Sequence, residues 1–162
     1  MNCSYGYSEG EMMKPCIVAL WAEKQLPIKN GLYWADGRSL AMNIESYPHP
    51  RLEKGEWFDL SQFHESNPDE ITYITMTKRI HLSIGGYGCV GEGSHGSEGF
   101  VAYLQPDGQL TWVMYSESSN PFVDIVEEAH GVICAHSSAN FVLRLHVDEP
   151  DRVKLNLIKS GA

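Results

Sequence analysis

The amino-acid sequence predicts a mainly β fold: a single domain built from a twisted antiparallel sheet or a β-sandwich of seven or more strands, with little helix. Three observations support this. Between residues 100 and 158, short apolar segments alternate with turn clusters, and several place apolar side chains at every second position, as half-buried strands do. Asp-Gly pairs at 36–37 and 107–108 supply hairpin turn chemistry. With 162 residues, 43% of them hydrophobic, the whole chain (1–162) fits one globular domain.

The N-terminal part of the chain offers weak signals. Residues 1–14 show no periodicity and are interpreted as irregular. Residues 16–21 form an apolar run too short to separate a buried strand from the start of a helix, and a strand is preferred.

A hairpin and a loop are expected next. Segments 32–34 and 40–44 flank the first Asp-Gly pair and should form two paired strands. Residues 45–56 contain Pro48, Pro50 and Gly55 and are expected to form a loop, which ends in a short strand or turn at 57–60.

The clearest alternation lies at residues 71–84, which are expected to form one long amphipathic strand with its apolar face on the core. Lys78 interrupts that face and indicates a bulge or a strand end. Residues 85–99 then hold seven glycines in fifteen positions. Such a density predicts a tightly folded or mobile loop rather than a regular element.

The second half of the chain is predicted to be a meander. Six strands separated by turn residues are expected in about sixty residues, at 100–104, 110–115, 122–126, 132–135, 141–147 and 153–158.

Composition limits the possible partners and compartments. Twelve basic residues against twenty-one acidic ones give a net charge of −9, which disfavours nucleic acid and favours a basic protein partner. The apolar runs are too short for a signal peptide or a membrane span, so a cytoplasmic protein without a membrane partner is expected. The cysteines at 3, 16, 89 and 134 lack CxxC spacing and are interpreted as free thiols, with two disulfides as the alternative. The oligomeric state is left open.

Acidic residues gather at turns of the meander. The first cluster contains Glu117, Asp124, Glu127 and Glu128, and the second contains Asp148, Glu149 and Asp151. Ordinary solubility at turns and the binding of a basic surface explain these clusters equally well. An exposed Trp57 or Tyr115 beside them would favour binding, because aromatic side chains anchor interfaces.

Three sequence patterns suggest a cofactor, catalytic or metal site, but each lacks a feature that such a site requires. Residues 86–91 match G-x-G-x-x-G, but more helix breakers follow, so no dinucleotide cofactor is expected. Ser94 and His95 are adjacent, but a nucleophile elbow needs glycine two residues before the serine, and that position holds Glu92. The seven histidines show no metal-ligand spacing, and no metal is expected.

The second half also resembles small acidic immunity proteins of bacterial contact-dependent growth inhibition systems. The resemblance is carried by strand and turn patterns at 99–104, 106–108, 110–112, 119–122 and 141–145. It implies a cytoplasmic non-enzyme that binds the C-terminal domain of a matching toxin, often a nuclease, and blocks its active site.

The expected function is therefore that of an immunity protein that neutralises a basic toxin domain through the two acidic clusters. Two alternatives stay open. One is a small ligand-binding or hydrolytic β-fold with its site in residues 85–99, using Ser94, His95 and Cys89. The other is a structural β-module of a larger assembly.

Overall fold

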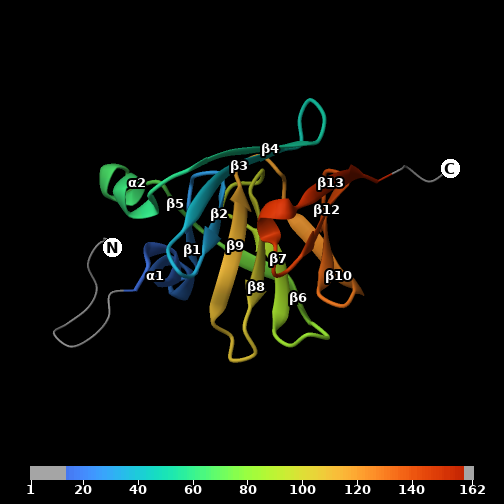
Figure 1. Cartoon of the computed structure of the whole chain (residues 1–162). Helices are drawn as coiled ribbons and strands as arrows, with labels where there is room; N and C mark the ends of the chain where they lie inside the picture. The colour runs from blue at the N-terminus through green and yellow to red at the C-terminus, as the bar shows by residue number, and fades with distance from the viewer. Residues whose placement is uncertain (1–13, 159–162) are drawn as a thin grey trace.

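The computed structural model describes residues 14–158 (Figure 1). These residues form a mainly β fold, as predicted, with thirteen strands and two short α-helices. In chain order the elements are α1 (Cys16–Ala22), β1 (Gln25–Pro27), β2 (Gly31–Trp34), β3 (Ser39–Glu45), β4 (Arg51–Trp57), α2 (Leu60–Ser66), β5 (Ile71–Tyr73), β6 (Thr75–His81), β7 (Tyr87–Glu92), β8 (Gly99–Leu104), β9 (Leu110–Ser116), β10 (Phe122–Ala129), β11 (Val132–Ser137), β12 (Phe141–His146), the 3-10 turn η1 (Pro150–Arg152) and β13 (Lys154–Leu157).

The strands form three antiparallel sheets. The largest has seven strands in the order β4-β3-β2-β9-β8-β7-β6, the second is the meander β10-β11-β12-β13, and the third is the pair β1-β5. The predicted hairpins β2-β3 and β8-β9 are confirmed, as are the six strands of the second half. The meander predicted as one sheet is divided, however, because β8 and β9 belong to the seven-stranded sheet and β10 to β13 to the other.

Both faces of the seven-stranded sheet are covered. On one face Trp112 and Met114 of β9 pack with Phe122 and Phe141 of the four-stranded sheet. On the other face the alternate residues of β9, including Tyr115, pack with α1, β1 and α2. The period of two along a strand explains how one strand serves two cores. The four-stranded sheet, the large sheet and the helical side are thus three layers (Figure 1).

The apolar run at 16–21 forms α1 instead of the preferred strand. The carbonyl of Pro15 accepts hydrogen bonds from Val18 and Ala19, so the proline is the N-cap residue of the helix. Ile17 and Leu20 then lie buried on one side of the helix. Buried residues three positions apart are typical of a helix, but a run of six residues is too short for this spacing to distinguish a helix from a strand.

The prediction of a loop at 45–56 is wrong for the second part of this segment, which forms β4. Both prolines precede the strand, and Gly55 lies at a register shift opposite Ala41, where an added Cβ would lie 3.1 Å from the alanine Cβ. An edge strand tolerates such a bulge. The turn expected at 57–60 leads instead into α2, which Asp59 caps by accepting a hydrogen bond from Gln62 N at 3.2 Å.

The long strand expected at 71–84 divides at Ile74. β5 pairs with β1, whereas β6 is an edge of the seven-stranded sheet. Ile80 and Leu82 pack on the core between the sheets, as the alternation predicted, but Met76 is 41% exposed. The bulge predicted at Lys78 is confirmed by the register shift after Met76.

The prediction of a glycine-rich loop at 85–99 is wrong for the residues of β7, which form a strand paired with β6 on one side and β8 on the other. A Cβ at Gly91 would lie 2.1 Å from the Thr75 carbonyl oxygen and 2.5 Å from the Phe100 ring. Glycine is therefore required at position 91 because neighbouring groups leave no room for a Cβ. Such close approach is a common reason for glycine within a strand.

The cysteine prediction holds for two of the three described cysteines. Cys89 and Cys134 are buried free thiols, but Cys16 is disulfide-bonded, which a reducing compartment would not favour. None of the helices within residues 14–158 has the length and apolar character needed to cross a membrane.

Candidate acidic binding site

A carboxylate-lined pocket of about 380 Å³ opens at the end of the seven-stranded sheet where β8 begins and β9 ends. Four segments that are distant in sequence supply its walls: the turn before β2, the approach to β5, the loop between β7 and β8, and the residues after β9. Its lining residues are Ile28, Glu70, His95, Ser97, Glu98 and Glu117.

Glu98 is the anchor of this pocket, since it is only 2% exposed and its carboxylate is held by several donors. The Thr72 hydroxyl donates to Oε1 at 3.0 Å and the His95 backbone N–H donates to the same oxygen at 2.7 Å. The Tyr115 hydroxyl donates to Oε2. A buried carboxylate is stable only with such partners, so Glu98 fixes the β7-β8 loop against β5 and β9.

Tyr115 is a permanent donor in this network. Burial, followed by its hydrogen bond to Glu98, raises the pKa of the phenol far above its usual value. The phenol therefore stays protonated and uncharged, so it does not repel the neighbouring carboxylates. In the sequence analysis, an exposed Tyr115 would have favoured a binding surface. In the structure, Tyr115 is buried and holds the Glu98 carboxylate in place.

His95 is positioned by Glu98 and faces solvent. Its Nδ1 lies 3.2 Å from Glu98 Oε1, and its side chain is largely exposed. A carboxylate only accepts hydrogen bonds, so Nδ1 is the donor in this contact. In this arrangement His95 contributes positive charge to the pocket only when protonated.

The carboxylates of the pocket repel one another. Partial burial raises the pKa of Glu117, and the nearby charges of Glu70 and Glu98 raise it further, whereas His95 opposes them. Among residues 14–158, no lysine or arginine forms an ion pair with Glu70, Glu98 or Glu117. The pocket therefore concentrates three carboxylates beside one imidazole, that of His95, and no lysine or arginine of residues 14–158 pairs with them.

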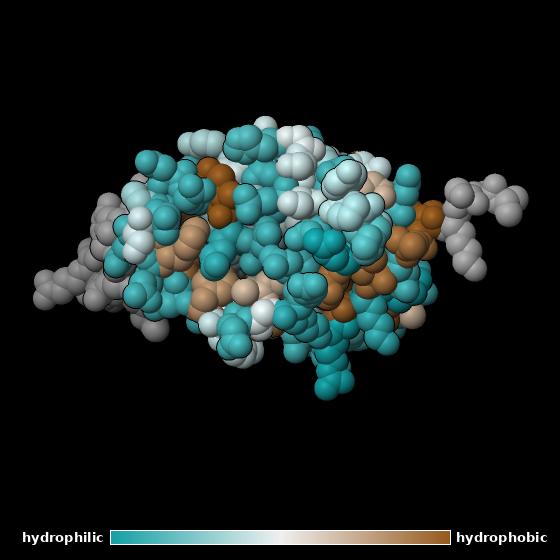
Figure 2. All heavy atoms as spheres, turned by 90° about the horizontal axis from the view of Figure 1, so that it is seen from above, coloured by the Kyte–Doolittle hydropathy of each residue, from teal (hydrophilic) through white to brown (hydrophobic). Residues whose placement is uncertain are grey.

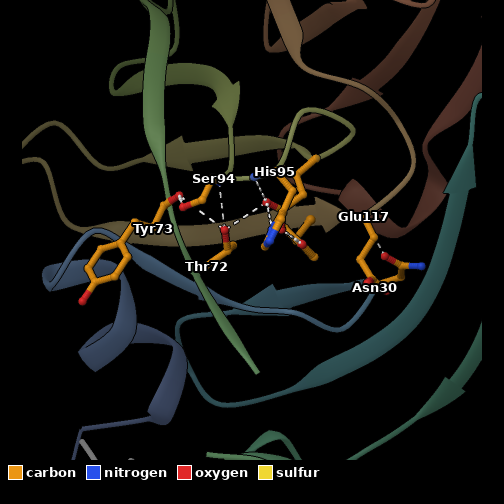
Figure 3. Close-up of polar contacts among 8 residues, drawn as sticks. Asn30, Thr72, Tyr73, Ser94, His95 and Glu117 are labelled. Atoms are coloured by element: carbon orange, nitrogen blue, oxygen red, sulfur yellow. Dashed lines mark hydrogen bonds and ion pairs between the residues drawn. The ribbon is translucent and has the colours of Figure 1, made fainter. Parts of the chain in front are cut away.

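The first acidic cluster is divided by the fold. Glu117 lies at the pocket, where its backbone N–H donates to Asn30 Oδ1 at 2.7 Å (Figure 3). The other three members lie on β10 and bind partners of this chain. Asp124 pairs with Lys78, and Glu128 makes a bidentate pair with Arg144 at 2.6 and 2.9 Å.

Glu127, the third member on β10, joins two turns. It accepts hydrogen bonds from Ser83 N at 2.8 Å, from the Ser83 hydroxyl at 2.7 Å and from Gly131 N at 2.9 Å. These bonds, led by Gly131, lower its pKa. The Lys78 and Arg144 partners likewise lower the pKa of Asp124 and Glu128. These carboxylates therefore connect β10 to β6, to β12 and to the adjoining turns.

The second acidic cluster lies, as expected, between the last two strands. Glu149 pairs with Arg152 at 3.0 Å across the 3-10 turn, and Asp151 lies within that turn. The Asp148 backbone N–H donates to His146 Nδ1 at 3.1 Å. One of its three carboxylates thus already has a guanidinium partner.

The residues of the hydrolytic alternative do not form a nucleophile and its base. The Ser94 hydroxyl donates to the Tyr73 carbonyl oxygen at 3.1 Å, away from His95 (Figure 3). Cys89 is fully buried in β7, and burial raises its pKa to about 12, which disfavours the reactive thiolate. The G-x-G-x-x-G segment begins at Gly86, continues into β7 and opens no helix, so it lacks the geometry of a dinucleotide site.

Sequence reasoning missed Glu70 and Glu98. Neither belongs to a cluster in the sequence, and they meet Glu117 only because β5, β8 and β9 bring their ends together. Within the described chain, 14–158, no group of three or more His, Cys, Asp or Glu side chains is placed to hold a metal ion.

Comparison with protein-family models, curated proteins and solved structures finds no match to this chain.

Proposed function

We propose that this chain is an immunity protein that binds a basic toxin domain and blocks the toxin's active site. The observation that carries the proposal is the pocket formed by Glu70, Glu98 and Glu117, in which several carboxylates meet without a lysine or arginine partner among residues 14–158. The net charge of −9 adds a long-range field of the same sign.

The pocket has the properties of a contact for a cationic side chain. Partial burial raises the pKa of Glu117 most, and the charges of Glu70 and Glu98 add to it; a lysine or arginine of the partner would oppose this second contribution. The Glu98 carboxylate is held in place before binding, so little conformational entropy is lost when a partner arrives. Complementary charge then provides specificity and a fast association rate.

The proposal changes the expected contact residues. Asp124, Glu127 and Glu128 are engaged within the chain, and a partner would have to compete with Lys78, Arg144 and the Ser83 turn for them. Glu117 and the pocket are therefore placed at the centre of the proposed interface. Asp148, Glu149 and Asp151 stay as predicted secondary contacts.

Co-expression tests the proposal. The chain should rescue the growth of bacteria that express the basic toxin domain encoded beside it, and the two proteins should co-purify. The double variant Glu70→Gln/Glu117→Gln should raise the dissociation constant by about tenfold or more, since each close ionic contact contributes on the order of 1 kcal/mol.

A matched control has the same change of charge elsewhere. Glu23→Gln/Glu65→Gln removes two exposed carboxylates at α1 and α2, and it should bind as the unchanged chain does. Failure of the unchanged chain to bind or protect would contradict the proposal. A hydrolytic activity that is lost in His95→Ala would support the enzyme alternative instead.

A further inference from the structure

The loop between β3 and β4 stands out from the body of the molecule. Residues 46–50 have the sequence Ser-Tyr-Pro-His-Pro and form the projection above the sheets in Figure 1. Tyr47, the second residue of this loop, is 84% exposed. Two prolines fix backbone angles in this short segment, so its conformational freedom is small.

The base of this loop is attached to the segment that carries Glu117. Ser46 N donates to the Ser118 carbonyl oxygen at 2.9 Å, and Glu45 forms a parallel bridge with Ser118. Across the loop, the Arg51 guanidinium pairs with Glu45 and closes its two ends. The projection therefore has a fixed position on the molecule.

The loop and the acidic pocket share one end of the seven-stranded sheet. Asn30 connects them, because its Oδ1 accepts from Glu117 N while its Nδ2 donates to Asn43 Oδ1 at 3.2 Å on β3. Figure 2 views the molecule from above and shows the side facing the viewer as mostly hydrophilic, with separate apolar patches. An exposed aromatic ring thus stands at the same end of the sheet as an acidic recess.

We infer that residues 46–50 are a second contact of the partner-binding surface, in which Tyr47 enters a hollow of the partner that is bordered by lysine or arginine side chains. This inference rests on the proposed function. A convex, proline-stiffened loop fits a concave surface, and the carboxylates beside it complement basic residues at the rim of that surface. Tyrosine is among the residues that most often dominate binding energy, because a large ring is desolvated at little entropic cost.

Tyr47→Ala tests the inference. Loss of a dominant interface tyrosine weakens binding by about 30-fold or more, mostly through faster dissociation. Calorimetry and surface-binding kinetics with the toxin domain would measure both quantities. Tyr47→Phe, which keeps the ring, should retain most of the affinity.

Tyr73→Ala is the matched control. Tyr73 is 63% exposed, and its ring points away from the pocket in Figure 3, so its removal should change the affinity by less than about twofold. Both variants should keep the melting temperature of the unchanged chain because both rings are exposed. Unchanged affinity in Tyr47→Ala, with the unchanged chain binding normally, would overturn this inference and leave the proposed function standing. No binding by the unchanged chain would overturn both.

Discussion

At the scale of single residues, Glu117 illustrates a conflict between stability and binding. Its carboxylate is surrounded by Glu70 and Glu98, and partial burial together with these charges raises its pKa in the folded chain. A raised carboxyl pKa means that the folded state favours the protonated form. The ionised group therefore opposes folding at neutral pH, and this opposition disappears as the pH falls below the ordinary carboxyl range.

Glu117→Gln should accordingly stabilise the chain at neutral pH, by less than about 1 kcal/mol because the group is exposed and screened. The gain should vanish by about pH 4, where the carboxyl of the unchanged chain is protonated as well. Urea unfolding at several pH values would measure it, with Glu65→Gln on α2 as the control. A loss of stability at neutral pH would show that Glu117 is not repelled by its neighbours.

At the scale of secondary-structure elements, β7 depends on glycines that the sequence prediction assigned to a loop. Gly91→Ala should destabilise the chain by about 3 kcal/mol, because its Cβ would overlap the Thr75 carbonyl and the Phe100 ring. Gly96→Ala is the control, since nothing lies within 4 Å of an added Cβ there. Thermal or urea unfolding of the two variants would compare them. Equal stability would contradict the close packing of β6, β7 and β8.

These elements also show what sequence patterns can and cannot predict. Alternation and Asp-Gly turns depend on local geometry, and they predicted β2, β3 and the strands of the second half correctly. Gly91 and the pocket carboxylates depend on which strand ends meet, and local patterns do not contain that information. Glu117 and Asp124 are seven positions apart, yet one borders the pocket of the large sheet and the other pairs with Lys78 from β10.

At the scale of the whole molecule, the charge of −9 should govern how fast a basic partner arrives. The association rate constant should fall by about tenfold or more between roughly 0.05 and 0.5 M salt, while the dissociation rate constant changes much less. Stopped-flow mixing with the toxin domain would measure both. The Glu70→Gln/Glu117→Gln variant should show a weaker salt dependence than the Glu23→Gln/Glu65→Gln control. An association rate that ignores salt would contradict electrostatic steering.

The covering of β9 on both sides has a consequence for how the molecule comes apart. Its backbone amides are bonded to β2 and β8, and its side chains belong to both apolar interiors. Neither interior can open without loosening the strand that the other one needs. Amide hydrogens along β9 should therefore exchange with deuterium only when the entire domain unfolds, and the edge strands β4 and β6 should exchange long before.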